Sequence, residues 1–293
     1  MRKISIITVC YNIKDEIERT CESIISQTAN NYEWIVVDGG STDDTVDILN
    51  KYKDKMSVFI SEKDTGIYNA MNKGIQKATG EWCIFMNGGD CFASKEIIEK
   101  FSQLDGIYKY ADIIYGNVCI INKNKKTYIK KYPYSLTKSY FFKDNINHQS
   151  TFIKTELFEK YGLYNENYQI AADWEKWLVF ILNNAKFTYW NTPISDFYSG
   201  GASTTQSKKL QSEIQSIQKK YFFDGEVKLS DNTKQYIFLF KKIPLFFIKK
   251  KKFPYKINIK LFNFIPIYSI KQKEKTYIHY LFSFIPLFTI KDK

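Results

Sequence analysis

The sequence predicts an α/β protein with a doubly wound, mostly parallel sheet, followed by a basic, aromatic C-terminal tail. The first observation is an alternation, over residues 3–118, of short apolar runs rich in Ile and Val with polar segments of helical spacing. Such apolar runs are typical of strands that are buried on both faces of a parallel sheet. The second is the composition, 44% hydrophobic and 25% charged, which is that of a folded protein.

Four strands and three helices are expected in this first part of the chain. The expected strands are residues 3–9, 33–38, 56–61 and 81–86, and the expected helices are residues 16–27, 44–52 and 67–78. In doubly wound sheets, ligands bind beyond the carboxyl ends of the strands. The residues that directly follow each strand are therefore the first candidates for a functional site.

The pattern changes after residue 112. Residues 112–130 predict a hairpin whose loop is 123–126, and residues 171–185 predict a helix with one apolar face. A pair of strands is expected from KFTYW (186–190) and ISDFYS (194–199), and a polar helix from about 205 to 221. We place the end of the globular domain near residue 225, which leaves residues 226–293 as a separate tail.

The tail is expected to bind something that is negatively charged. Residues 231–293 contain 14 lysines and three acidic residues, so they hold almost all of the formal net charge of +12. Three copies of I-P-[LI]-[FY]-x-I-K begin at Ile243, Ile265 and Ile285, and their prolines exclude helix interiors. The leading hypothesis is docking on an anionic membrane surface, where each lysine contributes ~1 kcal/mol. The alternatives are packing of extended arms on the body and, least favoured, binding of nucleic acid.

The number and spacing of the cysteines and histidines limit the possible kinds of metal site and the expected cellular compartment. With only His148 and His279, a zinc centre built on several histidines is excluded. The five cysteines are never spaced C-x-x-C, which predicts reduced thiols in a cytoplasmic protein. No run approaches the ~18 apolar residues of a membrane-spanning helix. We therefore expect a cytoplasmic protein, peripheral on the inner face of the cell membrane.

Polar residues and glycines follow all four expected strands. These segments are CYN (10–12), DGGSTD (38–43), EKDTG (62–66) and NGGD (87–90). Each alone is compatible with an ordinary turn, but all four are expected to converge at one edge of the sheet. Together with VVDGGSTDDT and DTGIYNAMNKGIQKATGEW, they resemble the family 2 glycosyltransferases of the GT-A fold over about residues 3–200.

The resemblance implies the reaction and its partners. A member of that family transfers a sugar from a nucleotide-diphosphate sugar to an acceptor hydroxyl, with inversion at the anomeric carbon. For this chain it implies a saccharide or a polyprenyl-linked saccharide as acceptor, and a role in the assembly of cell-surface polysaccharide or glycan.

Donor-binding residues follow from the matched motifs. The resemblance assigns Asp38 to the nucleobase, and a carboxylate is a good acceptor for a uracil imide N–H or a guanine edge. Asp64 and Gly66 occupy the donor-binding end of the third strand, where the N-terminus of a helix favours phosphate. Asn12 and Asn87, which follow the first and fourth strands, complete the implied donor side.

The resemblance also implies a divalent metal, Mg²⁺ or Mn²⁺, that bridges the two donor phosphates. Asp90 matches the last carboxylate of the D-x-D type motif, and such ions need few protein ligands. The sequence departs from the motif at its first position, Asn87, and at its middle acidic position, Gly89. Metal binding would then rest on a single carboxylate.

A general base is needed, since accepting the proton of the attacking hydroxyl contributes ~10²–10⁴-fold. The resemblance places Asp173 in this role, although Ala172 replaces the first acid of the usual E-D pair. Glu175 is the reserve candidate, and the competing interpretation of Asp173 is a helix N-cap. His148 and Gln149 form an H-Q pair that is expected on the acceptor or phosphate side, and not as the base.

Other functions are less well supported. No G-x-G-x-x-G follows the first strand and no G-x-x-x-x-G-K-[ST] is present, which disfavours a dehydrogenase and a phosphate-loop NTPase. A sugar-phosphate nucleotidyltransferase would need a G-x-G-T-R-L type loop where Tyr11 to Lys14 stand. A non-catalytic scaffold that binds nucleotide or membrane remains open, because acids are missing at Asn87 and Ala172.

Overall fold

The computed structural model describes residues 3–122, 127–198 and 206–223, together with the backbone of six strands between residues 235 and 291. Its chain forms two compact units, Met1–Asp224 and Gly225–Lys293. Each unit is described by itself.

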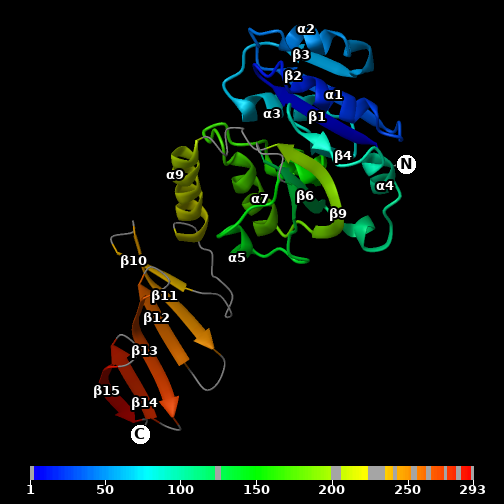
Figure 1. The fold of residues 1–293 in the computed structure, drawn as a ribbon. Coiled ribbons are helices and arrows are strands. Elements are labelled where there is room, and N and C mark those ends of the chain that lie inside the picture. The colour runs from blue at the N-terminus through cyan, green and yellow to red at the C-terminus, as the bar shows by residue number, and fades with distance from the viewer. Residues whose placement is uncertain are drawn as a thin grey trace. The chain divides into compact units, whose positions relative to one another are not determined.

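The first unit begins with four parallel strands. They are β1 (Ile4–Cys10), β2 (Tyr32–Asp38), β3 (Val58–Ser61) and β4 (Trp82–Phe85), in the order β3-β2-β1-β4. Every residue of β1 and β4 is buried, as expected for apolar strands that are covered on both faces. The predicted parallel strands are thus confirmed, and Figure 1 shows them in blue and cyan.

Helices connect these strands. They are α1 (Ile17–Ile25), α2 (Thr45–Asn50) with the short 3₁₀ helix η1 (Lys53–Lys55), and α3 (Ile67–Lys77). Helix α3 packs against β1 and β2. Gly74 permits this close approach, because a Cβ there would lie 2.4 Å from Cγ2 of Ile7. The packing fixes the N-terminus of α3 beside the carboxyl end of β1.

Further strands extend the sheet in a mixed pattern. The sheet continues from β4 through β8 (Thr151–Lys154), β6 (Ile113–Ile121), β9 (Phe187–Tyr198) and β5 (Cys91–Phe92), and β7 (Thr127–Lys130) pairs with β6. β8 is antiparallel to both neighbours, β6 and β9 are parallel, and β5 is antiparallel to β9. The expected doubly wound parallel arrangement therefore holds for one half of the sheet only.

Two local expectations have different outcomes. The predicted hairpin is confirmed by the antiparallel pairing of β6 with β7, and its loop lies outside the described residues. The predicted pair of strands between 186 and 199 is wrong, since β9 is one strand along β6 with an irregular register near Asn117. The pairing register shifts on both sides of Asn117, which pairs with Pro193, and the chain continues there as one strand without a turn.

The remaining helices flank the second half of the sheet. They are α4 (Ile97–Ser102), η2 (Gly106–Tyr110), α5 (Lys138–Phe141), η3 (His148–Ser150), α6 (Glu156–Tyr161), α7 (Ala172–Leu182), α9 (Ser207–Gln218) and the π-helical turn η4 (Lys219–Phe223). Side chains of α9 and η4 bond to α7 and to the segment before it, and Figure 1 shows α7 and α9 in green and yellow. The expected helices near 171–185 and 205–221 are confirmed by α7 and α9.

The second unit is an antiparallel sheet in sequential order. Its strands are β10 (Gln235–Leu239), β11 (Ile243–Lys251), β12 (Lys256–Leu261), β13 (Ile265–Lys273), β14 (Thr276–Leu281) and β15 (Ile285–Lys291). Each copy of the repeat begins a strand, namely β11, β13 or β15. Among the helices of the described residues, none has the length and apolar character to cross a bilayer. All five cysteines are free thiols.

Candidate functional site

A cavity of about 470 Å³ opens at the carboxyl ends of β1 and β4. It is bounded by the end of β1, the start of α3, the loop after β4, the segment before α7 and the residue before α9. Its lining residues are Val9, Cys10, Tyr11, Ile13, Asp64, Thr65, Gly66, Ile67, Ala70, Asn87, Gly88, Gln169, Ile170 and Gln206. Three predicted donor residues, Asp64, Gly66 and Asn87, thus share one cavity. A cavity of about 530 Å³ elsewhere contains no predicted site residue.

Asn12 ties the end of β1 to the loop after β2. Its backbone has a φ of 49°, a left-handed conformation that Asn tolerates better than most residues. Its Oδ1 accepts the backbone N–H of Thr42 at 2.8 Å, and its own N–H donates to Oγ of Ser41 at 2.8 Å. Asn12 therefore shapes the rim of the cavity through its neighbours Tyr11 and Ile13.

Asp38 organises the loop that follows β2. The residue is fully buried, and its Oδ2 accepts the N–H groups of Gly40 and Ser41 and the hydroxyl of Ser61, at 3.1, 3.0 and 2.8 Å. The Ser41 hydroxyl donates to Oδ1. The next acid, Asp43, accepts the N–H of Thr45 in the first turn of α2, whose N-cap residue is Asp44. Asp38 lies behind the cavity lining, and its expected contact with the nucleobase stays a prediction.

Asp64 is the carboxylate that lines the cavity at this end. Its Oδ1 accepts the N–H of Gly66 at 3.0 Å. Its Oδ2 occupies the space that a side chain at position 39 would fill, since a Cβ on Gly39 would lie 2.4 Å away. Burial raises the pKa of Asp64, and the nearby charge of Asp38 raises it further. Gly39 thus makes room for a carboxylate that reaches over from the start of α3.

The NGGD loop is held by α1 and buries its carboxylate. Thr20 Oγ1 accepts the N–H of Gly89 at 2.9 Å and donates to the carbonyl of Asp90 at 2.8 Å, while Arg19 Nε donates to the carbonyl of Gly89 at 2.8 Å. Asp90 is 6% exposed, and burial raises its pKa to about 6. Gln149 Nε2 donates to Oδ2 of Asp90 at 2.9 Å and partly offsets that cost.

The oxygen atoms near Asp90 are of the kind that binds a hard divalent cation. Oδ1 of Asn87 and Oε1 of Gln149 are buried oxygens without a hydrogen-bond partner. Carboxylate and amide oxygens are ligands that Mg²⁺ and Mn²⁺ accept. No group of three His, Cys, Asp or Glu side chains that could hold a metal occurs in the described residues. The residues therefore fit an ion that takes most of its ligands from phosphate and water.

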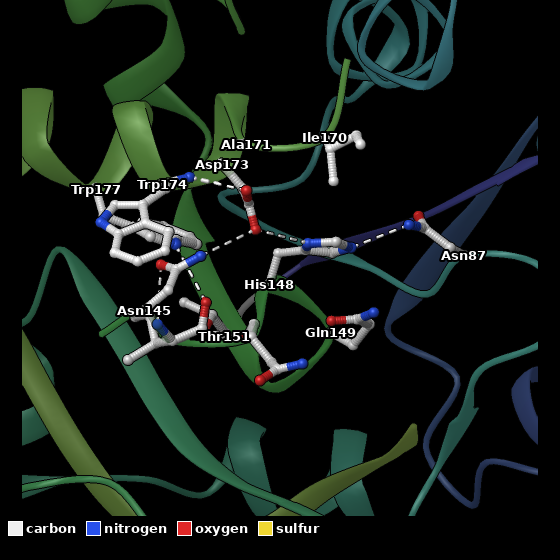
Figure 2. Close-up of polar contacts among 12 residues, drawn as sticks. Asn87, Asn145, His148, Gln149, Thr151, Ile170, Ala171, Asp173, Trp174 and Trp177 are labelled. Carbon is white, nitrogen blue, oxygen red and sulfur yellow. Dashed lines mark hydrogen bonds and ion pairs between the residues drawn. The ribbon is translucent and has the colours of Figure 1, made fainter. Parts of the chain in front are cut away.

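Asp173 lies in the first turn of α7 and is 8% exposed. Its Oδ1 accepts the hydroxyl of Tyr68 at 3.2 Å and the N–H of Trp174 at 2.8 Å. Its Oδ2 lies 3.4 Å from Nδ2 of Asn145 and 3.3 Å from Nδ1 of His148 (Figure 2). The N-cap residue of α7 is Ala171, so the interpretation of Asp173 as the N-cap is wrong.

His148 and Gln149 connect the two parts of the site. His148 bridges Asp173 and Asn87, whose Nδ2 lies 2.9 Å from Nε2 of the ring (Figure 2). When the Asn87 amide donates to Nε2, the ring proton lies on Nδ1 and points to Asp173. The next residue, Gln149, contacts Asp90. The candidate base and the candidate metal ligand are thus linked through two adjacent residues of η3.

Glu175, the reserve candidate for the base, contacts residues of η4. It is 3% exposed, and its Oε1 accepts Nζ of Lys220 at 2.7 Å and the hydroxyl of Tyr221 at 2.9 Å. These contacts fasten η4 to α7. Several residues of the site were not predicted from the sequence, because they lie outside the motifs that carry the family resemblance: Asn145, Gln169, Ile170 and Gln206. For Ile170, proximity to the start of the predicted helix was the one available signal.

The model of the family "Glycosyl transferase family 2" matches residues 5–168. This match covers more than half of the chain. The chain therefore belongs to glycosyltransferase family 2.

Curated relatives resemble this chain over its first part. A "PGL/p-HBAD biosynthesis glycosyltransferase" of Mycobacterium bovis is 32% identical over 174 residues, which are 58% of this chain and 66% of the relative. The glycosyltransferase MJ1057 of Methanocaldococcus jannaschii is 26% identical over 194 residues, 63% of this chain and 66% of the relative. The chain thus spans just under two thirds of the length of these relatives.

Solved structures share the fold. TarS 1–349 of S. aureus in complex with UDP-GlcNAc has a TM-score of 0.59 at 18% identity, over 75% of this chain and 68% of that one. The mannosyltransferase PcManGT of Pyrobaculum calidifontis, in complex with GDP-Man and Mn²⁺, has a TM-score of 0.58 at 14% identity, over 77% and 65%. The mixed α/β sheet is therefore the GT-A fold.

Proposed function

We propose that this protein transfers a sugar from a nucleoside-diphosphate sugar to an acceptor hydroxyl with inversion. The observation that carries the proposal is the chain Asn87–His148–Asp173, which connects a residue of the donor cavity to a carboxylate at the start of a helix. Inversion results from a single displacement at the anomeric carbon, which needs one base for the acceptor hydroxyl and one leaving group, the nucleoside diphosphate. Asp173 would accept the proton of the attacking hydroxyl, and His148 would keep its carboxylate in place.

The donor would lie in the cavity with its nucleobase against Asp64. Of the two carboxylates at this end, Asp64 lines the cavity, whereas Asp38 bonds to its own loop. The diphosphate would lie toward Gly66, where α3 presents the positive end of an 11-residue helix. Asp38 would fix the loop beside Asp64, and its expected contact with the nucleobase is the alternative that Asp38→Asn and Asp64→Asn distinguish. Donors of this class, UDP-GlcNAc and GDP-Man, are bound by the two structural neighbours.

A divalent metal would be held by Asp90 with help from Gln149. Since an amide oxygen and nitrogen can exchange places by rotation, Oε1 of Gln149 could occupy the point 2.9 Å from Oδ2 of Asp90. The two oxygens could then bind the same divalent ion. When bound, the ion would neutralise charge on the leaving diphosphate. Mn²⁺ accompanies GDP-Man in one structural neighbour.

For the acceptor, we propose a saccharide carried on a polyprenyl lipid, used in surface polysaccharide or glycan assembly. One curated relative is named for the biosynthesis of PGL and p-HBAD. The 14 lysines of residues 231–293 would hold the protein against the anionic inner face of the cytoplasmic membrane. The aromatic residues between them favour a position at the interface.

The activity is tested by mixing the protein with UDP- and GDP-sugars, with and without Mn²⁺, and by measuring release of the nucleoside diphosphate in the presence of extracted lipid-linked saccharides. Asp173→Asn is expected to lower turnover ~10²–10⁴-fold with donor binding unchanged. Asp144→Asn is the matched control, since this neighbouring carboxylate is exposed and pairs with Lys130. Equal turnover in Asp173→Asn and the parent would refute the assignment. Nucleotide binding without any turnover would favour a non-catalytic scaffold.

Membrane docking is tested separately with the full chain. Substituting Lys249, Lys250, Lys251 and Lys252 with Gln should release the protein from vesicles that contain anionic lipid. Transfer to a soluble acceptor should persist, because the first unit, Met1–Asp224, is not altered. Unchanged binding to the vesicles would contradict docking through these lysines, and equal binding to neutral vesicles would contradict the electrostatic mechanism.

A further inference from the structure

The N-terminus of helix α7 is only partly capped by its own side chains. Its N-cap residue is Ala171, which offers no side-chain acceptor, and the first backbone N–H groups of a helix have no partner within the helix. Asp173 is the first acidic residue of the helix, and as a capping residue it would turn its carboxylate toward these N–H groups. In the structure Oδ1 of Asp173 accepts the N–H of Trp174, and the carboxylate also contacts Tyr68, Asn145 and His148.

Glu213 of α9 provides a partial cap at the N-cap residue and the two residues before it, from 42 residues away. Its Oε1 accepts the N–H of Gln169, and its Oε2 accepts the N–H groups of Ile170 and Ala171, all at 2.9 Å. The glutamate is 9% exposed. Three consecutive backbone donors are thus satisfied by one buried carboxylate, and charge-assisted bonds of this kind are the strong ones.

The same contacts shape the cavity. Gln169 and Ile170, whose N–H groups Glu213 holds, line it, and so does Gln206 at the beginning of the α9 segment. Nζ of Lys209 donates to the side chain of Gln169. The segment that Glu213 fixes therefore joins the cavity wall to the carboxylate of Asp173 two residues further on.

We propose that Glu213 is a positioning residue for Asp173. It holds the N-cap residue Ala171 and the two residues before it, and so fixes both the start of the helix that carries Asp173 and the cavity wall at Gln169 and Ile170. The inference rests on the proposed transfer reaction. It gives α9, which belongs to no motif of the family match at residues 5–168, a defined part in the site.

Removal of the carboxylate should affect turnover more than donor binding. In Glu213→Ala, the N-terminus of α7 loses its cap and Asp173 shifts, and a displacement of about 1 Å costs on the order of 10²-fold in rate. The donor KM should rise less than turnover falls, because Asp64 and Gly66 lie at the start of α3 and in the loop before it, and Glu213 holds only the wall at Gln169 and Ile170. Glu213→Gln, which retains one acceptor oxygen, should fall between Glu213→Ala and the parent.

A matched control separates positioning from stability. Ile217→Val removes a methyl group from a buried residue of the same helix and should lower the melting temperature without touching the cap. A second test combines Glu213→Ala with Asp173→Asn. If Glu213 acts through Asp173, it should have no further effect on turnover in that background.

Hydrogen exchange of the amides of Gln169, Ile170 and Ala171 tests the contact without any activity. Faster exchange in Glu213→Ala, together with the turnover results above, supports the proposal. Unchanged exchange, full additivity with Asp173→Asn, or equal losses of turnover in Ile217→Val would overturn it. If the parent protein turns over no donor, the proposed function fails, and the exchange result alone decides whether Glu213 holds this segment.

Discussion

Replacement of Asp90 by Asn should stabilise the protein at neutral pH. The carboxyl group is buried, and its pKa is raised from 3.8 to about 6, chiefly by burial. A difference of this size corresponds to about 3 kcal/mol, at about 1.36 kcal/mol for each pKa unit. An amide of the same shape can still accept from Gln149 and carries no charge to bury.

The sign of the pH dependence follows from the direction of the shift. Because the pKa is higher in the folded protein, the folded state binds a proton between about pH 4 and pH 6 that the unfolded state has lost. The favourable contribution of Asp90 is therefore complete below about pH 4 and is lost as the pH rises through about 6. Asp90→Asn should lack this loss, so its advantage should grow between about pH 4 and pH 6 and be complete above pH 6.

Urea unfolding between pH 4 and pH 8, without divalent ions, measures the effect as a free energy of unfolding. Asp43→Asn is the control, since this carboxyl group is partly exposed and its pKa is lowered, mainly by the hydroxyl of Thr45; it should not stabilise. If Asp90→Asn and the parent have the same stability at pH 7.5, the carboxylate is not penalised by burial and the reasoning fails. Asp90→Asn should also lose Mn²⁺-dependent nucleotide binding, which calorimetry measures independently.

The remaining predictions concern the donor end of the cavity and the fastening of α7. Asp64→Asn should weaken nucleotide binding, measured by calorimetry, whereas Asp38→Asn should chiefly destabilise the fold, by about 1–3 kcal/mol, because its loop loses a charged acceptor. Gly39→Ala should displace the Asp64 carboxylate and weaken nucleotide binding; an equal further loss in an Asp64→Ala background would contradict this mechanism. Glu175→Gln should lower stability by about 1–3 kcal/mol, by weakening the buried contacts to η4, without changing turnover per folded molecule; a specific loss of turnover would restore it as a candidate base.

The local sequence pattern was sufficient to predict the strands of the first half of the fold. Apolar runs formed β1, β2 and β4 near their expected bounds, because strands buried on both faces favour apolar side chains. β3 also lies near its expected bounds, although its residues are only partly buried or exposed. The placement of Asp64, Gly66 and Asn87 around one cavity also followed, since the carboxyl ends of adjacent parallel strands meet at one edge. The second half was less predictable: β8 inserts between β4 and β6, and this order is set by contacts between distant segments.

The sequence by itself determined the family, the parallel strands and the acidic residues at their ends, because these depend on residue type and short-range order. Tertiary structure alone decided which oxygens face the cavity. Asp38 and Asp64 are equally acidic in the sequence, yet one is enclosed by its own loop and the other fills the space beside Gly39. Asp173 meets Tyr68 from 105 residues away, and Glu213 caps its helix from another helix. Such pairings depend on where packed elements place their side chains, and no local pattern records that.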